Sequence, residues 1–359
     1  MVNAPTSSTE VSRRVPKRQP MRLNLALQGG GAHGAFTWGV LDQLLEDDKL
    51  EIGWISGTSA GAVNAVALAF GFAKGGRAEA RATLKAVWQA IEKSQPPDLT
   101  AMNPFMSSAV ASMASRMSPY QFNPMGFDPL RTLLTDHIDF EFLRTRSTIE
   151  LLIAATDVAT GRARLFRRHE MSVEAVLASA CLPTVHHAVE IDGHAYWDGG
   201  FSANPDIVTL ATESPVEDTM IVVLNHAVRP GIPKTAPEIA AHMSEMTFNQ
   251  PFLHDIELIA TARGTRLGWF TDSGGTIARL RRHRFHVIET GRHTSNLATA
   301  TKMSADAELL SYLFGAGRTE AAKWLGRHLD QIGKTDTAEL DVRYLGQARP
   351  VAPADLSTG

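Results

Sequence analysis

The hydrophobic pattern of the first 75 residues predicts two strand–turn–helix units in succession. Residues 23–27 form a short apolar run that ends at three glycines, as expected for a buried strand entering a turn. Apolar side chains then recur at helical spacing, at Phe36, Val40, Leu41, Leu44 and Leu45. A second apolar run over 52–56 precedes an alanine-rich helix over 62–73. Two such units favour an α/β architecture with a mostly parallel sheet.

The remaining pattern predicts further strands and a mainly helical C-terminal region. A β-branched run over 149–156 predicts a central strand, and Ser172 is placed to cap a helix over 172–180. Asp192-Gly193 predicts the turn of a hairpin over 189–197. The other predicted elements are a helix opened by Asp128-Pro129, strands over 219–224 and 284–288, and helices over 236–249, 251–270, 304–314 and 318–332.

Residues 95–130 differ in composition from the rest of the chain. Methionines are frequent there, at Met102, Met106, Met113, Met117 and Met125, and phenylalanines and prolines lie between them. Methionine adapts its shape to its surroundings, so this stretch could be a flexible apolar cover over a lipid site. An irregular part of the core is the alternative interpretation, and the composition leaves both open.

Composition and charge limit the partners and the compartment. The 359 residues are 44% hydrophobic and 20% charged, as in ordinary globular proteins. The net charge of −3 gives no support for a nucleic-acid partner. Cys181 is the only cysteine and excludes an internal disulfide, which favours a reducing compartment such as the cytoplasm. No run reaches the ~18 apolar residues that a membrane-spanning helix needs, so any membrane contact is expected to be peripheral.

The strongest candidate for chemistry is the segment Gly57-Thr58-Ser59-Ala60-Gly61. It lies between a predicted strand and a predicted helix, where a tight turn projects a serine hydroxyl out of the sheet. Gly57 and Gly61 permit the crowded backbone that such a turn requires. Ser59 is therefore the candidate nucleophile of an acyl transfer.

A second glycine turn, from Gly29 to Gly34, also follows a strand and precedes a helix. Its backbone amides could hold the negative charge that acyl transfer builds on a carbonyl oxygen. Glycine turns at helix starts also bind phosphate, but no Gly-Lys-Ser/Thr follows here and the spacing does not match the dinucleotide fingerprint. The candidate donors of an oxyanion hole are the backbone amides of Gly29, Gly30, Gly31, Ala32, Gly34 and Ala60.

The third segment is Asp198-Gly199-Gly200, on a glycine turn after the predicted hairpin. A serine nucleophile needs a base within hydrogen-bond reach, and a carboxylate at a strand end can supply it. Asp192-Gly193, by contrast, is assigned to an ordinary hairpin turn.

Taken together and in this order, the three segments resemble the patatin-like phospholipase family. LALQGGGAHGAF is similar to the family's oxyanion block, GTSAG to its nucleophile turn, and YWDGGFSANP to its aspartate block, and the match covers about residues 23–227. The resemblance implies a three-layer α/β/α fold, a dyad of Ser59 and Asp198 without histidine, and hydrolysis of acyl esters of phospholipids or other lipids without a metal or organic cofactor. With the composition and pattern of the rest of the chain, this predicts a basic tail over 1–20, a catalytic domain over 21–232, a mainly helical extension over 233–346 and a tail over 347–359.

Two departures and several alternatives stay open at this point. The family commonly has arginine where this chain has His33, and the helical extension lies outside the matched blocks. A conventional Ser-His-Asp esterase, an acyltransferase and a non-catalytic lipid-binding protein are alternative hypotheses. Histidines that follow Asp198, as a triad would require, include His226, His242, His254, His283, His286 and His293. His186, His187 and His194 precede it and are interpreted as surface or hairpin residues, and Cys181 as a packing residue. No metal-ligand spacing occurs.

Overall fold

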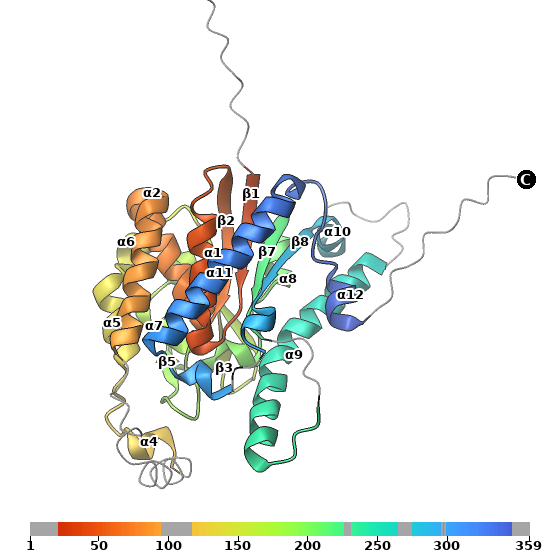
Figure 1. Cartoon of the computed structure of the whole chain (residues 1–359). Coiled ribbons are helices and arrows are strands. Elements are labelled where there is room, and N and C mark those ends of the chain that lie inside the picture. Colours follow the sequence, from red (N-terminus) through yellow and green to blue (C-terminus); the bar gives the residue numbers. More distant parts are fainter. Residues whose placement is uncertain are drawn as a thin grey trace, which may run out of the picture.

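A mixed β-sheet forms the centre of the molecule, and helices cover both of its faces (Figure 1). The structure is a computed structural model that describes residues 21–94, 117–225, 231–264, 275–295, 297 and 299–346. Within these ranges the sheet has eight strands in the order β5-β6-β3-β2-β1-β7-β8, and β4 pairs with β3 outside this path. The three-layer α/β/α fold expected from the sequence is confirmed.

The strands differ in direction between the middle and one end of the sheet. They are β1 (Met21–Leu27), β2 (Leu50–Thr58), β3 (Leu151–Asp157), β4 (Ala163–Arg167), β5 (Val189–Ile191), β6 (His194–Asp198), β7 (Asp218–Val223) and β8 (Arg284–Glu289). Neighbours from β3 through β2, β1 and β7 to β8 are parallel. β4 and β6 are antiparallel to β3, and β5 is antiparallel to β6. Because parallel strands end at one edge, the segments that follow β1 and β2 lie together.

The side chains of each central strand point alternately to the two faces of the sheet, where they pack into two separate hydrophobic cores. In β1, Leu23, Leu25 and Leu27 enter one core and Ala26 enters the other. The first face carries α1 (Gly34–Leu44), α2 (Ala60–Lys93), α5 (Pro129–His137), α6 (Phe140–Arg146), α7 (Val173–Ser179) and α11 (Ala307–His328). The second face carries α8 (Val208–Glu213), α9 (Ala236–Gly264), α10 (Thr276–Arg282) and α12 (Leu340–Leu345).

Most predicted elements are present, but one observed helix is longer than predicted and two others each join two predicted helices. α2 continues to Lys93 across a kink at Gly75 and Gly76. α9 passes through Pro251 as one helix, where two were expected. The break expected between 314 and 318 is wrong, because α11 runs through it. A Cβ on Gly317 would lie 2.1 Å from the Phe36 carbonyl oxygen, so glycine at this position permits close packing of α11 on α1.

The local turn chemistry agrees with the sequence. Ser172 caps α7 by accepting a hydrogen bond from Ala175, and Asp128 caps α5 by accepting one from Leu130. Asp192 and Gly193 both have positive φ, as the tight hairpin between β5 and β6 requires.

The C-terminal region is built into the same three layers. β8 extends the sheet beside β7, and α11 lies along α1 on the first face (Figure 1). The boundary at residue 232 stays a prediction. The two expected tails, over 1–20 and 347–359, lie outside the described residues, as do residues 95–116, which hold most of the methionine-rich stretch.

Candidate active site

Ser59 occupies a strained turn between β2 and α2. Its backbone has φ 54° and ψ −121°, a conformation that is costly for a residue with a side chain. Its amide donates to Ser179 Oγ at 2.9 Å, and its carbonyl accepts from Ala62 and Val63 to start α2. A Cβ on Gly61 would lie 2.1 Å from the Leu27 carbonyl oxygen, so only glycine fits there. The strain is held by these contacts and presents the hydroxyl at the carboxyl edge of the sheet.

Asp198 is buried beside this serine. It ends β6, is 1% exposed, and pairs across the sheet with Ala155 of β3. The Gly200 amide donates to Oδ1 at 2.7 Å. Within the described part of the chain, no group with normal hydrogen-bond geometry faces Oδ2. Burial raises the pKa of the Asp198 carboxyl to about 7, against the lowering effects of the Gly200 amide and the nearby Ser59 hydroxyl.

These positions give the two groups complementary properties. A carboxyl with a pKa near 7 can both accept and return a proton at neutral pH, as a general base must. The serine hydroxyl influences this pKa although no hydrogen bond of normal geometry joins the pair, and such bonds are often loose before substrate binds. Cys181 is a different case, because burial raises the pKa of its thiol to about 12 and keeps it protonated. Its interpretation as a packing residue agrees with this.

The six candidate oxyanion donors fall into two groups. The Gly29 amide already donates to Asn204 Oδ1 at 2.8 Å, and the Gly34 amide donates to carbonyls of its own turn. In the described chain, no hydrogen bond is recorded for the amides of the other four, which are Gly30, Gly31, Ala32 and Ala60. The sequence pattern could not separate these groups, since Asn204 is distant in the chain.

Several histidines of the described residues have partners other than Ser59 and Asp198. His33 is 3% exposed, and its Nε2 lies 2.8 Å from Thr301 Oγ1. This geometry agrees with a packing residue that holds a distant segment in place. Three of the candidates after Asp198 bond elsewhere: His283 to Thr219, His286 to Asp218 and Thr337, and His293 to Glu320 and Tyr312. His226 lies outside the described residues.

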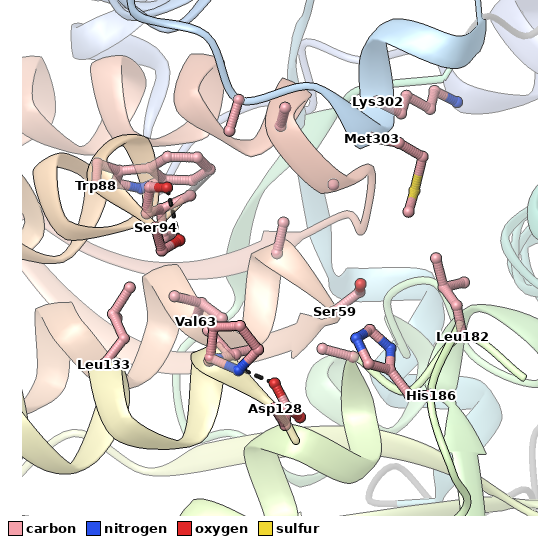
Figure 2. A pocket seen from close by; sticks show the side chains of 18 residues that line it. Ser59, Val63, Trp88, Ser94, Asp128, Leu133, Leu182, His186, Lys302 and Met303 are labelled. Carbon is pink, nitrogen blue, oxygen red and sulfur yellow. Dashed lines mark hydrogen bonds between the residues drawn. The ribbon is translucent and has the colours of Figure 1, made fainter. Parts of the chain in front are cut away.

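Two cavities meet at Ser59. The larger, of about 310 Å³, extends between α2 and α5 and is mostly apolar, with Val63, Trp88 and Leu133 in its wall. Figure 2 shows the Ser59 hydroxyl directed into this cavity, with Met303 pointing toward it from the opposite side. The smaller, of about 160 Å³, is bordered by Asp198 as well as Ser59, and by Asn225, Glu245 and Lys302.

Several residues of these walls were not found by sequence reasoning. His186, interpreted as a surface or hairpin residue, instead borders the larger cavity next to Leu182 (Figure 2). Lys302 and Met303 border both cavities, and Phe248 of α9 borders the smaller one. No local motif marks these positions, because only the packing of the C-terminal region against the glycine turn brings them to the serine.

Metal binding and membrane spanning were also considered for the described ranges. Among those residues, no three histidine, cysteine or acidic side chains form a group that could hold a metal ion. Within the same residues, every helix is too short or too polar to cross a bilayer.

Comparisons with known proteins were made for the sequence and for the structure. Residues 25–211, just over half of the chain, match the model of a family described as patatin-like phospholipase. No curated protein sequence matches the chain. Among solved structures, VipD from Legionella pneumophila is similar with a TM-score of 0.44 and 15% identity, over 86% of this chain and 67% of that one. The type III effector protein ExoU is similar with a TM-score of 0.28 and 14% identity, and the match covers 84% of this chain and 54% of that one.

Proposed function

Since the chain belongs to the patatin-like phospholipase family, we propose that it is a lipid acyl hydrolase in which Ser59 and Asp198 form a catalytic dyad. One observation carries the proposal. A serine on a strained turn lies beside a buried carboxylate whose Oδ1 is held by Gly200 and whose Oδ2 is left to accept a proton.

The reaction proceeds through an acyl-enzyme. Ser59 Oγ attacks the ester carbonyl carbon while its proton passes to Asp198 Oδ2. The tetrahedral intermediate then collapses, the bond from carbon to the leaving oxygen breaks, and Asp198 returns the proton to that oxygen. Water attacks the acyl-enzyme in the same way, giving its proton to Asp198, and the fatty acid leaves with Ser59 restored.

The negative oxygen of both intermediates is held by backbone amides. Gly30, Gly31, Ala32 and Ala60 carry the candidate donors, since the other two amides of the predicted set are engaged elsewhere. Ala60 begins α2, so its amide also lies at the positive end of a long helix. The larger cavity, with its apolar wall, receives the acyl chain, and no cofactor takes part.

Contact with a lipid surface is part of the proposal. α4 (Pro119–Phe122) is followed by exposed apolar side chains, among which Met125 is 92% and Phe127 is 71% exposed. This segment is held beside the pocket, because the Tyr120 ring stacks at 4.1 Å on His187, the neighbour of the lining residue His186. Large exposed apolar groups next to a lipid site are suited to a bilayer surface. Phe127→Ser should therefore reduce sedimentation with phospholipid vesicles, and unchanged sedimentation would remove this part of the proposal.

A fluorophosphonate reagent tests the central claim directly. It should label the wild-type protein at Ser59, and Ser59→Ala should abolish both labelling and hydrolysis of p-nitrophenyl esters. A folded wild-type protein that neither labels nor hydrolyses esters would instead be a lipid-binding protein. If acyl groups pass to an added alcohol faster than to water, the protein is an acyltransferase that uses the same intermediate.

A further inference from the structure

A short C-terminal segment is seated on the glycine turn of the site. The segment is η6 (Thr299–Met303), and a Cβ on Gly31 would lie 2.2 Å from the Lys302 carbonyl oxygen. Gly31 also has φ 56°, so both its conformation and its closeness to η6 require glycine. His33 and Thr301 add the 2.8 Å hydrogen bond between the same two segments. The backbone of Lys302 is thereby fixed next to the candidate oxyanion donors.

The side chain of Lys302 is directed toward the smaller cavity. Its ammonium donates to Asn225 Oδ1 at 2.6 Å, and Asn225 is 8% exposed. The backbone N–H of Asn225 in turn donates to Gln28 Oε1 at 2.9 Å, so the asparagine is fixed just after the end of β7. In Figure 2 Lys302 points away from Trp88 and Leu133, whereas Met303 enters the apolar cavity. Both residues border both cavities, but the Lys302 ammonium is held at Asn225, which borders the smaller cavity and not the larger one.

The smaller cavity carries both signs of charge. Ser244 and Glu245 of α9 border it together with Asn225 and Lys302. It thus combines an ammonium, a carboxylate, an amide and a hydroxyl beside the nucleophile. The larger cavity has a mainly hydrocarbon wall near α2 and α5, so the two cavities can separate the two halves of a lipid ester.

We propose that the smaller cavity binds the head group of a zwitterionic phospholipid, with Lys302 on the phosphate and Glu245 on the amine. This inference rests on the proposed function, because it needs the acyl chain in the larger cavity and the carbonyl at Ser59. The alcohol side of the ester then points into the smaller cavity, where a phosphate follows a few bonds later. Lysine is a compact charge that binds phosphate well, and a carboxylate next to it disfavours a second negative charge. Lys302 and Glu245 are specificity residues here and do not touch the reacting atoms.

The experiment compares lipids that have the same acyl chains and different head groups. Phosphatidylethanolamine, phosphatidylglycerol and diacylglycerol are presented in mixed detergent micelles to the full chain. The wild-type enzyme should prefer phosphatidylethanolamine. Lys302→Met should lower kcat/KM on both phospholipids about tenfold, mainly through KM, and should lower it much less on diacylglycerol. Lys302→Arg should restore most of the loss, and Lys334→Met, at an exposed lysine outside both cavities, is the matched control.

The second variant separates the two charges. Glu245→Gln should reduce the preference for phosphatidylethanolamine over phosphatidylglycerol while hydrolysis of diacylglycerol follows the wild type more closely. If Lys302→Met lowers kcat/KM equally on all three lipids, while the variant unfolds at the same rate as the wild type, the inference is overturned. A wild-type enzyme that hydrolyses all three lipids equally would also overturn it and leave the proposed function standing. Absence of both hydrolysis and Ser59 labelling would mean that the proposed function has failed.

Discussion

One aspartate is buried near the carboxyl ends of the parallel strands and another at their amino ends. The pKa values of these two residues, Asp198 and Asp218, are shifted in opposite directions. Asp198 lies at the carboxyl edge beside Ser59, where one amide donates to it, and burial raises its pKa to about 7. Asp218 begins β7 at the other edge and is 3% exposed. It receives hydrogen bonds from Arg284 at 2.8 and 3.0 Å, from His286 at 3.2 Å and from the Gly333 amide at 2.9 Å.

The difference shows that the partners of a buried carboxyl decide its role. Burial raises the pKa at both sites, but at Asp218 the hydrogen bonds from His286 and Arg284 outweigh burial and lower the pKa to about 2. Asp218 is therefore a permanent charge that joins β7 to β8. Among the described residues no cation pairs with Asp198, and its pKa of about 7 suits the catalytic role that we propose for it.

The largest expected effect is on catalysis at the carboxyl edge. Asp198→Asn keeps the shape of the side chain and removes the base, so it should lower kcat by about 10³-fold or more, as should Ser59→Ala. The double variant should be little worse than either single one, because the base acts only through the nucleophile. Rates on a p-nitrophenyl ester and circular dichroism of each variant are the measurements.

A histidine-based triad would contradict this first prediction. Each histidine after Asp198 should be changed to glutamine and assayed on the same ester. Loss of activity in one folded variant, at the level of Ser59→Ala, would replace the dyad. If Asp198→Asn retains most of the wild-type rate, the dyad is contradicted as well.

The corresponding substitution of Asp218 should lower the free energy of unfolding and leave kcat unchanged. Asp218→Asn removes the charge to which Arg284 and His286 donate and leaves Arg284 with the half-exposed Glu217 at 3.4 Å, which should cost about 1–3 kcal/mol. Urea unfolding should show this loss, while kcat of the folded fraction stays near the wild-type value. Asp136→Asn, at an exposed position, is the control. If kcat of Asp218→Asn falls as far as in Asp198→Asn, Asp218 has more than a structural role and the comparison is wrong.

The pH dependence of the rate sharpens the comparison further. Asp198 must be ionised to accept the serine proton, so kcat/KM should rise with pH through about 7 and then level off. At pH 6 the value should be about one tenth of the plateau, since roughly a tenth of the carboxyl groups are ionised there. Asp218 is ionised throughout this range and adds nothing. A flat profile between pH 6 and pH 8 would show that Asp198 is not the base that limits the reaction.

The smallest expected effect is the pH dependence of stability. The folded state holds the Asp198 proton more tightly than the unfolded state, so stability falls as pH rises from about 4 through about 7. Between pH 6 and pH 8 the wild type should lose about 1 kcal/mol more than Asp198→Asn, by the shift in this one pKa. Asp255, whose pKa burial and Asp206 raise to about 7, contributes to both proteins alike. Equal pH dependence in urea unfolding would contradict the raised pKa.

The parts of the site that depend on short spacing could be predicted from the sequence. The turn around Ser59 and the turn after Asp198 each follow from a few neighbouring residues, as do the caps at Ser172 and Asp128. The order of strand and helix likewise predicts a parallel sheet with two covered faces. These features are local, so the sequence carries them directly.

The remaining parts depend on which distant segments meet. The Gly29 amide is engaged because Asn204 arrives from another loop, and no pattern near Gly29 indicates that. Lys302 reaches the site through the path of the C-terminal region, and the raised pKa of Asp198 follows from its full burial. The unbroken course of α11 also depends on distant packing, because Gly317 meets the Phe36 carbonyl group of α1.

The seating of η6 on the glycine turn also sets a time at which the site is complete. Ser59 leaves the ribosome about 140 residues before Asp198 and about 240 residues before Lys302. At roughly 5–20 residues per second, the serine waits some 10–50 s for the last wall of its own cavity. During that interval the nascent chain carries a nucleophile without a complete site for acyl transfer. For the proposed hydrolase, we therefore expect ester cleavage only after synthesis has passed residue 303.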